Sequence, residues 1–336
     1  MQRLEKVVRI ILDSERPSDS LRPEVIEMNR LIAESQTVFK ARSEHIASGE
    51  TRTTNGLAES PTIAAMCADD FVRTVEFIRG IHAAIVDIRN QGLDRPVRVL
   101  DVGCGPYAIL TVPLRTIFPS SEATFTFIDL HAESIESTKS IVRTLGLSDA
   151  VSDYVVADAC SYFVPPEAQP DAILFEVMLA CLETTPQVAI MKNLSNQAPD
   201  AVYIPEEVSI DLMFVDPSLE FDLDRHLHYR DTRESDRVPV STVFVLNRDV
   251  AKSWANSCTN RLTASLVRIP GLLEDRFQPM LFTRIRTYKK HVIQEYASGL
   301  THPRRPHIEG VLTPGCTIQF YYELGRHPRL CGEVRT

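Results

Sequence analysis

The feature that most constrains this chain is a series of short apolar runs separated by stretches with helical spacing. The runs are VRVLDV (97–102), ATFTFIDL (123–130), VSDYVVAD (151–158) and PDAILFEV (170–177). The segments after the first, second and fourth runs have helical spacing, to about residues 118, 147 and 197. Strands that alternate with helices predict a parallel sheet covered by helices on both faces. Strands buried in such sheets are apolar along most of their length, as these runs are.

The segments on either side of this alternation have a different character. Residues 1–92 are predicted to be mostly helical, because 23–47 and 60–92 place apolar residues three and four apart. Ser60 followed by Pro61 is a suitable helix start, and Gly92 is a suitable stop. The polar segment 48–59 between the two helices is expected to be a lid or a linker.

The alternation of strands and helices stops after about residue 216. Four later segments are predicted to form antiparallel strands joined by turns: 241–247, 263–269, 279–288 and 316–324. We therefore divide the chain into three parts: an N-terminal helical cap (1–92), an α/β domain (93–216) and a β-rich C-terminal subdomain (217–336).

Composition excludes several classes of function. The net charge of −9 argues against a nucleic-acid partner, which would need a basic face. The N-terminal apolar stretch is interrupted by charges, so it is not a signal peptide, and no run is long enough to cross a bilayer. Seven scattered cysteines without a CxxC pair predict a reduced, cytoplasmic chain with no zinc site. The His226/His228 pair lies in a charged segment and is interpreted as part of a polar arm.

A glycine turn follows the first apolar run. Gly103 and Gly105 would let the backbone turn sharply and come close to a ligand beyond the carboxyl ends of the strands. A dinucleotide fingerprint would require a third glycine, but Tyr107 stands at that position and leaves little room for a pyrophosphate. We expect Gly103, Gly105 and Tyr107 to lie against a bound ligand other than a dinucleotide.

Acidic residues close three successive strands. Asp101 ends the first strand, Asp129 ends the second and Asp158 ends the third. Because the carboxyl ends of parallel strands share one edge of a sheet, these carboxylates should meet at one ligand site. Asp129 is placed to accept both hydroxyls of a ribose, and Asp158 is placed to meet an adenine amino group. Three such residues at successive strand ends favour a ligand site over solvated loop positions.

The motif VLDVGCG and these acidic strand ends resemble class I S-adenosylmethionine (SAM) dependent methyltransferases. That resemblance implies a Rossmann-like fold and SAM as cofactor. The stretch DDFVRTVEFIRGI (69–81) is similar to the D-x-x-R-T-x-x-[YF]-x-x-[AG]-I segment of protein arginine methyltransferases. The resemblance implies that Arg73 meets the SAM carboxylate, which a guanidinium can grip with two hydrogen bonds. It also implies the order helical cap, SAM domain and antiparallel β-subdomain, and a homodimer formed through an arm near 217–240.

The chain departs from that family where the substrate would bind. LFEVMLACLE (174–183) occupies the place of the family's double-glutamate hairpin, and Glu176 fits the first glutamate. Thr185 stands at the position of the second, and Glu183 is two residues away from it. The family's YFxxY segment is missing, and His302 is only a faint counterpart of its Thr-His-Trp loop. We interpret the scaffold as related and the substrate as different.

Glu176 is the candidate catalytic residue. A carboxylate at this edge could bind the ammonium of an acceptor, accept its proton and release the amine as a nucleophile. The sequence therefore predicts a SAM-dependent enzyme that methylates a small molecule. The missing second glutamate also fits a cyclase, in which the amine of SAM attacks its own γ-carbon to give methylthioadenosine and azetidine-2-carboxylate. A non-catalytic SAM-fold binding protein is a third hypothesis, and the intact acidic set argues against it.

Overall fold

The computed structural model describes residues 1–41, 44–221, 236–254, 257–271 and 274–335 of the 336-residue chain. Its centre is a five-stranded sheet in the order β5-β4-β3-β6-β7, with every neighbouring pair parallel. The strands are β3 (Val97–Val102), β4 (Ala123–Asp129), β5 (Val151–Val156), β6 (Ala172–Phe175) and β7 (Val202–Ile204). Each of the four apolar runs supplies one of them, so the predicted α/β fold is confirmed.

The helices of the parallel-sheet part are α5 (Ala132–Thr144) and α6 (Gln187–Gln197), with the short turns η4 (Ser148–Ala150), η5 (Pro166–Ala168) and η6 (Ala180–Leu182). The helix predicted between Gly105 and residue 118 was wrong. Only the 3₁₀ turn η3 (Val112–Thr116) forms there. Ala108 has a left-handed φ of 41°, which a right-handed helix cannot include, and Pro113 stands at the start of η3.

The N-terminal helices are α1 (Gln2–Ile11), η1 (Ser18–Leu21) and α2 (Arg22–Ala33). The helix predicted over 23–47 ends at Ala33 instead. Beyond it the Gln36 side chain accepts a hydrogen bond from Phe39 N at 2.7 Å and donates one to Phe39 O at 2.8 Å, which closes a loop. Buried Arg79 donates to the carbonyl oxygens of Ile11 at 2.8 Å and Asp13 at 2.6 Å, so it ties the end of α1 to the later helix α4 (Phe71–Asn90).

The polar segment expected to be a lid or linker contains a hairpin, β1 (Thr51–Thr53) with β2 (Gly56–Ala58). The helix predicted over 60–92 is divided into α3 (Pro61–Met66), η2 (Cys67–Asp69) and α4 (Phe71–Asn90). Ser60 caps α3 by accepting a hydrogen bond from Ile63 N at 3.1 Å, which confirms the predicted start. Gly92 follows the end of α4 with a φ of 83°, as expected of a stop.

Two four-stranded sheets form the C-terminal part, in the orders β12-β11-β8-β9 and β10-β14-β15-β13. Their pairs are antiparallel except for β13 with β15, which is parallel. The strands are β8 (Glu207–Val215), β9 (Arg237–Asn247), β10 (Arg261–Arg268), β11 (Gln278–Tyr288), β12 (His291–Ile293), β13 (His307–Glu309), β14 (Thr317–Glu323) and β15 (Arg329–Arg335). The short helices are α7 (Pro217–Glu220), α9 (Arg248–Ser253) and η8 (Gly299–Thr301). The four strands predicted from the sequence are β9, β10, β11 and β14.

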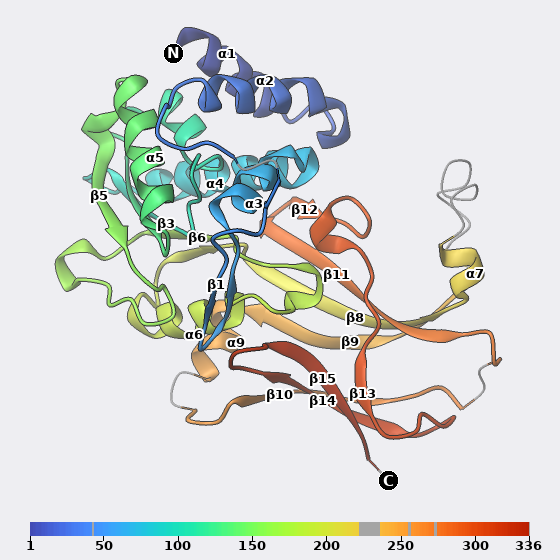
Figure 1. The fold of residues 1–336 in the computed structure, drawn as a ribbon. Helices are drawn as coiled ribbons and strands as arrows, with labels where there is room; N and C mark the ends of the chain where they lie inside the picture. The colour runs from blue at the N-terminus through green and yellow to red at the C-terminus, as the bar shows by residue number, and fades with distance from the viewer. Residues whose placement is uncertain (42–43, 222–235, 255–256, 272–273, 336) are drawn as a thin grey trace.

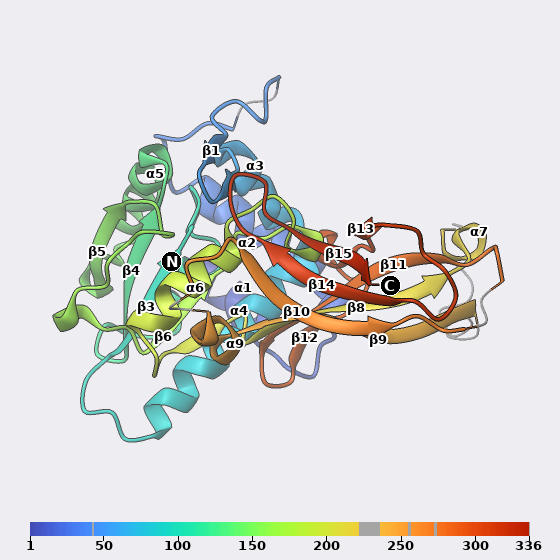
Figure 2. The same ribbon diagram turned by 90° about the horizontal axis from the view of Figure 1, so that it is seen from below.

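The change from parallel to antiparallel pairing falls between β7 and β8. The sequence-based division had placed β8 in the α/β domain, before residue 216, but β8 pairs with β9 and β11. Figures 1 and 2 both show the parallel sheet and the C-terminal strands side by side. Most of the arm expected near 217–240, with His226 and His228, lies outside the described residues.

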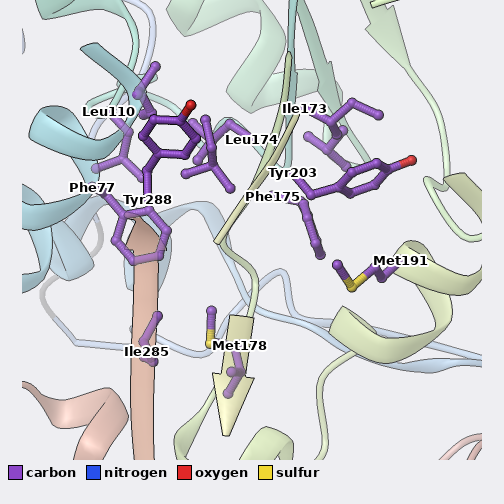
Figure 3. Packing of buried hydrophobic residues seen from close by; sticks show 14 of the residues in the cluster. Phe77, Leu110, Ile173, Leu174, Phe175, Met178, Met191, Tyr203, Ile285 and Tyr288 are labelled. Atoms are coloured by element: carbon purple, nitrogen blue, oxygen red, sulfur yellow. The ribbon is translucent and has the colours of Figure 1, made fainter. Parts of the chain in front are cut away.

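The parts share one hydrophobic core. Phe77 of α4, Phe175 of β6 and Tyr288 of β11 belong to the same cluster of buried side chains (Figure 3). Helix α4 comes so close to β11 at Gly80 that a Cβ there would lie 2.5 Å from Thr287 Oγ1. In the part of the chain that the structure describes, no helix combines the length and apolarity that a bilayer crossing requires.

Candidate functional site

A cavity of about 370 Å³ lies beyond the carboxyl ends of β3, β4 and β6. Its walls are mostly apolar, and its volume is within the range of ligand pockets, roughly 300–1,000 Å³. The structure brings seven of the eight sequence-predicted site residues to this cavity: Arg73, Asp101, Gly103, Gly105, Asp129, Asp158 and Glu176.

The glycine turn forms the floor of the cavity. Gly103 has a φ of 71° and Gly105 has a φ of 65°, a left-handed conformation that favours glycine. A Cβ built on Gly103 would overlap Cγ1 of Val177, which also lines the cavity. The amides of Gly103 and Cys104 both donate to Ile128 O, at 2.7 and 3.1 Å, and so fix the turn against β4. The close approach therefore requires glycine at residue 103.

The carboxylates at the strand ends are held by neighbouring backbone amides. Asp129 accepts from Gly105 N at 2.9 Å through Oδ2 and from His131 N at 2.8 Å through Oδ1. Asp158 accepts from Cys160 N at 2.9 Å through Oδ1. Each oxygen has more than one lone pair, so both side chains are oriented and can still accept from a ligand.

Asp101 has a different environment from the other strand-end carboxylates. Its side chain is buried, and it accepts a hydrogen bond from Thr111 Oγ1 at 2.5 Å. Burial raises the pKa of Asp101 to about 7, with the Thr111 hydroxyl opposing the rise and the charge of Asp129 adding to it. This carboxyl therefore titrates near neutral pH.

Arg73 and Glu176 form a buried ion pair with each other. Their side chains are only 8% and 4% exposed. Arg73 also donates from Nη1 to Cys67 O at 3.2 Å, and Glu176 accepts from Met178 N at 3.4 Å. The two residues assigned from the sequence to a cofactor carboxylate and an acceptor amine thus meet at one end of the cavity.

Asp70 links this ion pair to the C-terminal part. It caps α4 by accepting from Arg73 N at 3.1 Å. It also accepts from Ser298 Oγ at 2.6 Å and from Gly299 N at 2.9 Å. Gly299 and Leu300 of η8 line the cavity, so Asp70 fixes both the helix that carries Arg73 and a wall from the C-terminal part.

Three residues considered from the sequence lie away from the cavity. Tyr107 was expected to touch the ligand, but it is not part of the lining, and its ring packs edge-on against Phe39 at 5.8 Å. The Glu183 carboxylate lies 3.0 Å from His307 Nε2. The exposed His302 ring contacts Tyr296 at 5.7 Å.

The hairpin and the residue that follows it contribute a wall that sequence reasoning missed: Thr53, Leu57 and Ala58 of the hairpin line the cavity, and so does Glu59. Leu57 N donates to Thr184 O at 2.7 Å, and Thr51 Oγ1 lies 3.1 Å from Nε2 of His131. Figure 1 shows β1 between the parallel-sheet part and the C-terminal strands. No sequence motif marks these residues, since their position depends on contacts with distant loops.

Glu59 is the acidic residue of this wall. Burial raises its pKa, the charge of Glu50 adds to the rise, and the guanidinium of Arg73 opposes it. Cys67 and His131 are further lining residues that the sequence analysis did not single out. Among the described residues, no group of three histidine, cysteine, aspartate or glutamate side chains could hold a metal ion.

The parallel sheet, the glycine turn and the antiparallel C-terminal part together form a class I SAM-dependent methyltransferase fold that resembles protein arginine methyltransferases. No family model matches the sequence, and no curated protein matches it.

Several solved structures have a similar fold. A chain of the Trypanosoma brucei PRMT1 enzyme–prozyme heterotetrameric complex with AdoHcy is similar with a TM-score of 0.51 and 13% identity, over 81% of this chain and 92% of that one. PRMT6 is similar with a TM-score of 0.49 and 12% identity, over 76% and 95%. Arabidopsis thaliana protein arginine methyltransferase 10 has a TM-score of 0.46 and 11% identity, over 76% and 86%.

Proposed function

We propose that this chain is a SAM-dependent methyltransferase whose acceptor is a small-molecule amine or a similar nucleophile. The observation that carries the proposal is one cavity that gathers the glycine turn, Asp129, Asp158, Arg73 and Glu176 at the carboxyl edge of the sheet. The Trypanosoma brucei structure of similar fold was obtained with AdoHcy, the product that SAM leaves after methyl transfer.

The residues of the cavity fit SAM. Asp129 would accept the ribose hydroxyls, Asp158 the adenine amino group, and Arg73 would bind the carboxylate. The missing Cβ of Gly103 leaves the turn close to the ligand space, and the apolar walls exclude water from it. SAM supplies a methyl group on a sulfonium, which needs no general acid to leave. The protein therefore has to position the nucleophile and exclude water.

Glu176 would act on the acceptor. It now pairs with Arg73, and a ligand carboxylate that binds Arg73 would compete for the same guanidinium and release a Glu176 oxygen. That oxygen can bind an ammonium and accept its proton. In the related family, two glutamates of one hairpin bind the guanidinium of the substrate. Here Glu176 fits the first of them, but Glu183, the nearest candidate for the second, lies outside the cavity lining. This supports an acceptor other than arginine.

The same observation favours a second candidate function. Because Glu183 does not line the cavity, the hairpin offers no second glutamate to bind a separate acceptor. The amino group of the aminobutyryl arm of SAM can then be the nucleophile. The reaction would form a bond between that nitrogen and the γ-carbon and break the bond from the γ-carbon to sulfur. Its products are azetidine-2-carboxylate, methylthioadenosine and a proton, which Glu176 would accept.

Product analysis tests both functions. The purified protein is incubated with SAM alone, and the nucleoside product is identified by mass spectrometry. Methylthioadenosine above the spontaneous background, lost in Arg73→Ala and Glu176→Ala, would assign cyclisation. S-adenosylhomocysteine (SAH) formed only after a small-molecule extract is added would assign methyl transfer.

A matched control is Arg89→Ala, because Arg89 lies on the same helix and its partner is the half-exposed Glu122 at 3.4 Å. This variant should keep the wild-type product and rate. If calorimetry detects no SAH binding to the wild-type protein, both functions are refuted.

A further inference from the structure

One acidic side chain in the cavity has no partner among the residues that the structure describes. Six carboxylates line the cavity: Glu59, Asp70, Asp101, Asp129, Asp158 and Glu176. Five of them accept the hydrogen bonds described above, from backbone amides, hydroxyls or Arg73. The Glu59 carboxylate has no hydrogen bond or ion pair with any residue that the structure describes.

The surroundings make this lack of a partner costly. Burial raises the pKa of Glu59, so its charged form is penalised in the folded protein. The residues near Glu59 in the sequence that also line the cavity have apolar side chains and offer no donor: Leu57, Ala58, Ile63 and Ala64. Glu59 is partly buried, and a ligand that fills the cavity would shield its carboxylate further from water. A cationic group of that ligand would offset the penalty on the charged form.

The backbone on both sides of Glu59 is fixed. Two residues before it, Leu57 N donates to Thr184 O at 2.7 Å. The residue after it, Ser60, is fully buried and caps α3 through Ile63 N at 3.1 Å. The carboxylate is therefore presented to the cavity by a structured segment and does not depend on a free loop end.

Glu59 and Arg73 line the same cavity, and the charge of Arg73 opposes the rise in the pKa of Glu59. A guanidinium and an unpaired carboxylate in one cavity are complementary to a ligand with a carboxylate and an ammonium. Together Glu59, Arg73 and Glu176 carry one excess negative charge, which also suits a cationic ligand.

We propose that Glu59 binds a primary ammonium group of the ligand. This inference rests on the proposed function, and it adds a binding residue from a hairpin that lies outside the motifs of the sequence. Two sources could supply the ammonium: the amino-acid arm of SAM and an amine acceptor.

Calorimetry with matched ligands tests the first source. SAH and an analogue in which hydrogen replaces its α-ammonium are titrated into the wild-type protein and into Glu59→Gln. A charge-assisted hydrogen bond predicts that SAH binds the variant about 10-fold to 100-fold more weakly. The analogue should bind both proteins equally. Glu122→Gln removes the same charge from a half-exposed position just before β4, outside the cavity lining, and should leave both affinities unchanged.

The second source has its own measurement. 1,4-Diaminobutane is titrated into SAH-saturated wild-type protein and into SAH-saturated Glu59→Gln. Binding to the wild type that the variant loses, with SAH affinity unchanged, would assign the acceptor ammonium. In either case Glu59→Gln should melt at the same temperature as the ligand-free wild type or higher, because it removes an unpaired carboxylate.

Two results would overturn the inference. One is a Glu59→Gln variant that binds SAH and the diamine like the wild type. The other is a variant that loses affinity for SAH and for the ammonium-free analogue equally, since Glu59 would then support the cavity wall only. These outcomes differ from failure of the proposed function, in which the wild-type protein itself binds no SAH.

Discussion

Breaking the buried pair between Arg73 and Glu176 should destabilise the ligand-free protein strongly. Both side chains are less than a tenth exposed. Among the described residues, the Arg73 side chain also donates to Cys67 O at 3.2 Å, and the Glu176 side chain also accepts from Met178 N at 3.4 Å. Arg73→Met leaves a buried carboxylate, and Glu176→Gln leaves a buried guanidinium. Removing one partner of such a pair costs about 3–5 kcal/mol in the free energy of unfolding.

The double variant Arg73→Met/Glu176→Gln separates this pairing from simple loss of packing. Removing both charges leaves no uncompensated ion, so the double variant should be destabilised far less than the sum of the singles. The expected coupling energy is several kcal/mol, against about 0–1 kcal/mol for an exposed pair. Equilibrium urea unfolding without ligand, followed by circular dichroism, measures all four proteins of the cycle.

The same cycle has a clear refuting result. Single variants that each cost less than about 1 kcal/mol, or whose effects simply add, would show that the pair behaves as a solvated one. Arg73 and Glu176 would then not be shielded from water in the ligand-free protein. SAH titration into Arg73→Met gives an independent readout, because loss of the guanidinium should also weaken binding of a ligand carboxylate.

Three further predictions concern the glycine turn and the strand ends. Gly103→Ala should cost about 2–5 kcal/mol in the free energy of unfolding, the sum of about 1–2 kcal/mol for a left-handed φ and about 1–3 kcal/mol for overpacking. Adding Val177→Ala to this variant should recover only the overpacking part. Full recovery would contradict the role of φ. Asp129→Ala should weaken SAH binding by about 10-fold to 100-fold in calorimetry with little change in the circular dichroism spectrum, whereas unchanged affinity would remove Asp129 from the site. Burial raises the pKa of Asp101 to about 7 from 3.8, so the folded chain binds its proton more tightly and this carboxyl destabilises the protein increasingly as pH rises through that window. Asp101→Asn should therefore gain stability relative to wild type between about pH 4 and pH 7 in urea unfolding, and a constant difference would refute the shift.

The sequence was sufficient for the parts of the site that depend on strand ends. Apolar runs ending in Asp101, Asp129 and Glu176 became β3, β4 and β6, and the parallel topology brought their ends to one cavity. This works because every parallel strand delivers its carboxyl end to the same edge, so a local pattern determines a long-range juxtaposition.

The remaining features depend on contacts that local pattern does not encode. Glu59 lines the cavity because a hairpin of polar residues docks on Thr184, far away in the sequence. Tyr107 was assigned to the ligand from its place in the motif, but it is not part of the cavity lining, and its ring packs on Phe39. The sequence-based division placed β8 in the α/β domain, whereas the structure pairs it with β9 and β11. The apolar pattern of one strand does not distinguish a parallel from an antiparallel sheet.

The walls of the cavity come from three parts of the chain: the N-terminal part with the hairpin, α3 and α4, the parallel-sheet part, and η8. A fragment limited to the parallel sheet would keep the glycine turn but lose Glu59, Arg73 and Leu300. The affinity of the whole protein therefore includes the free energy with which these parts dock on one another. A saturating ligand that binds only the assembled cavity stabilises the state in which the parts are docked. The parts should then unfold together in one cooperative transition. A ligand titration thus also measures the assembly of the chain.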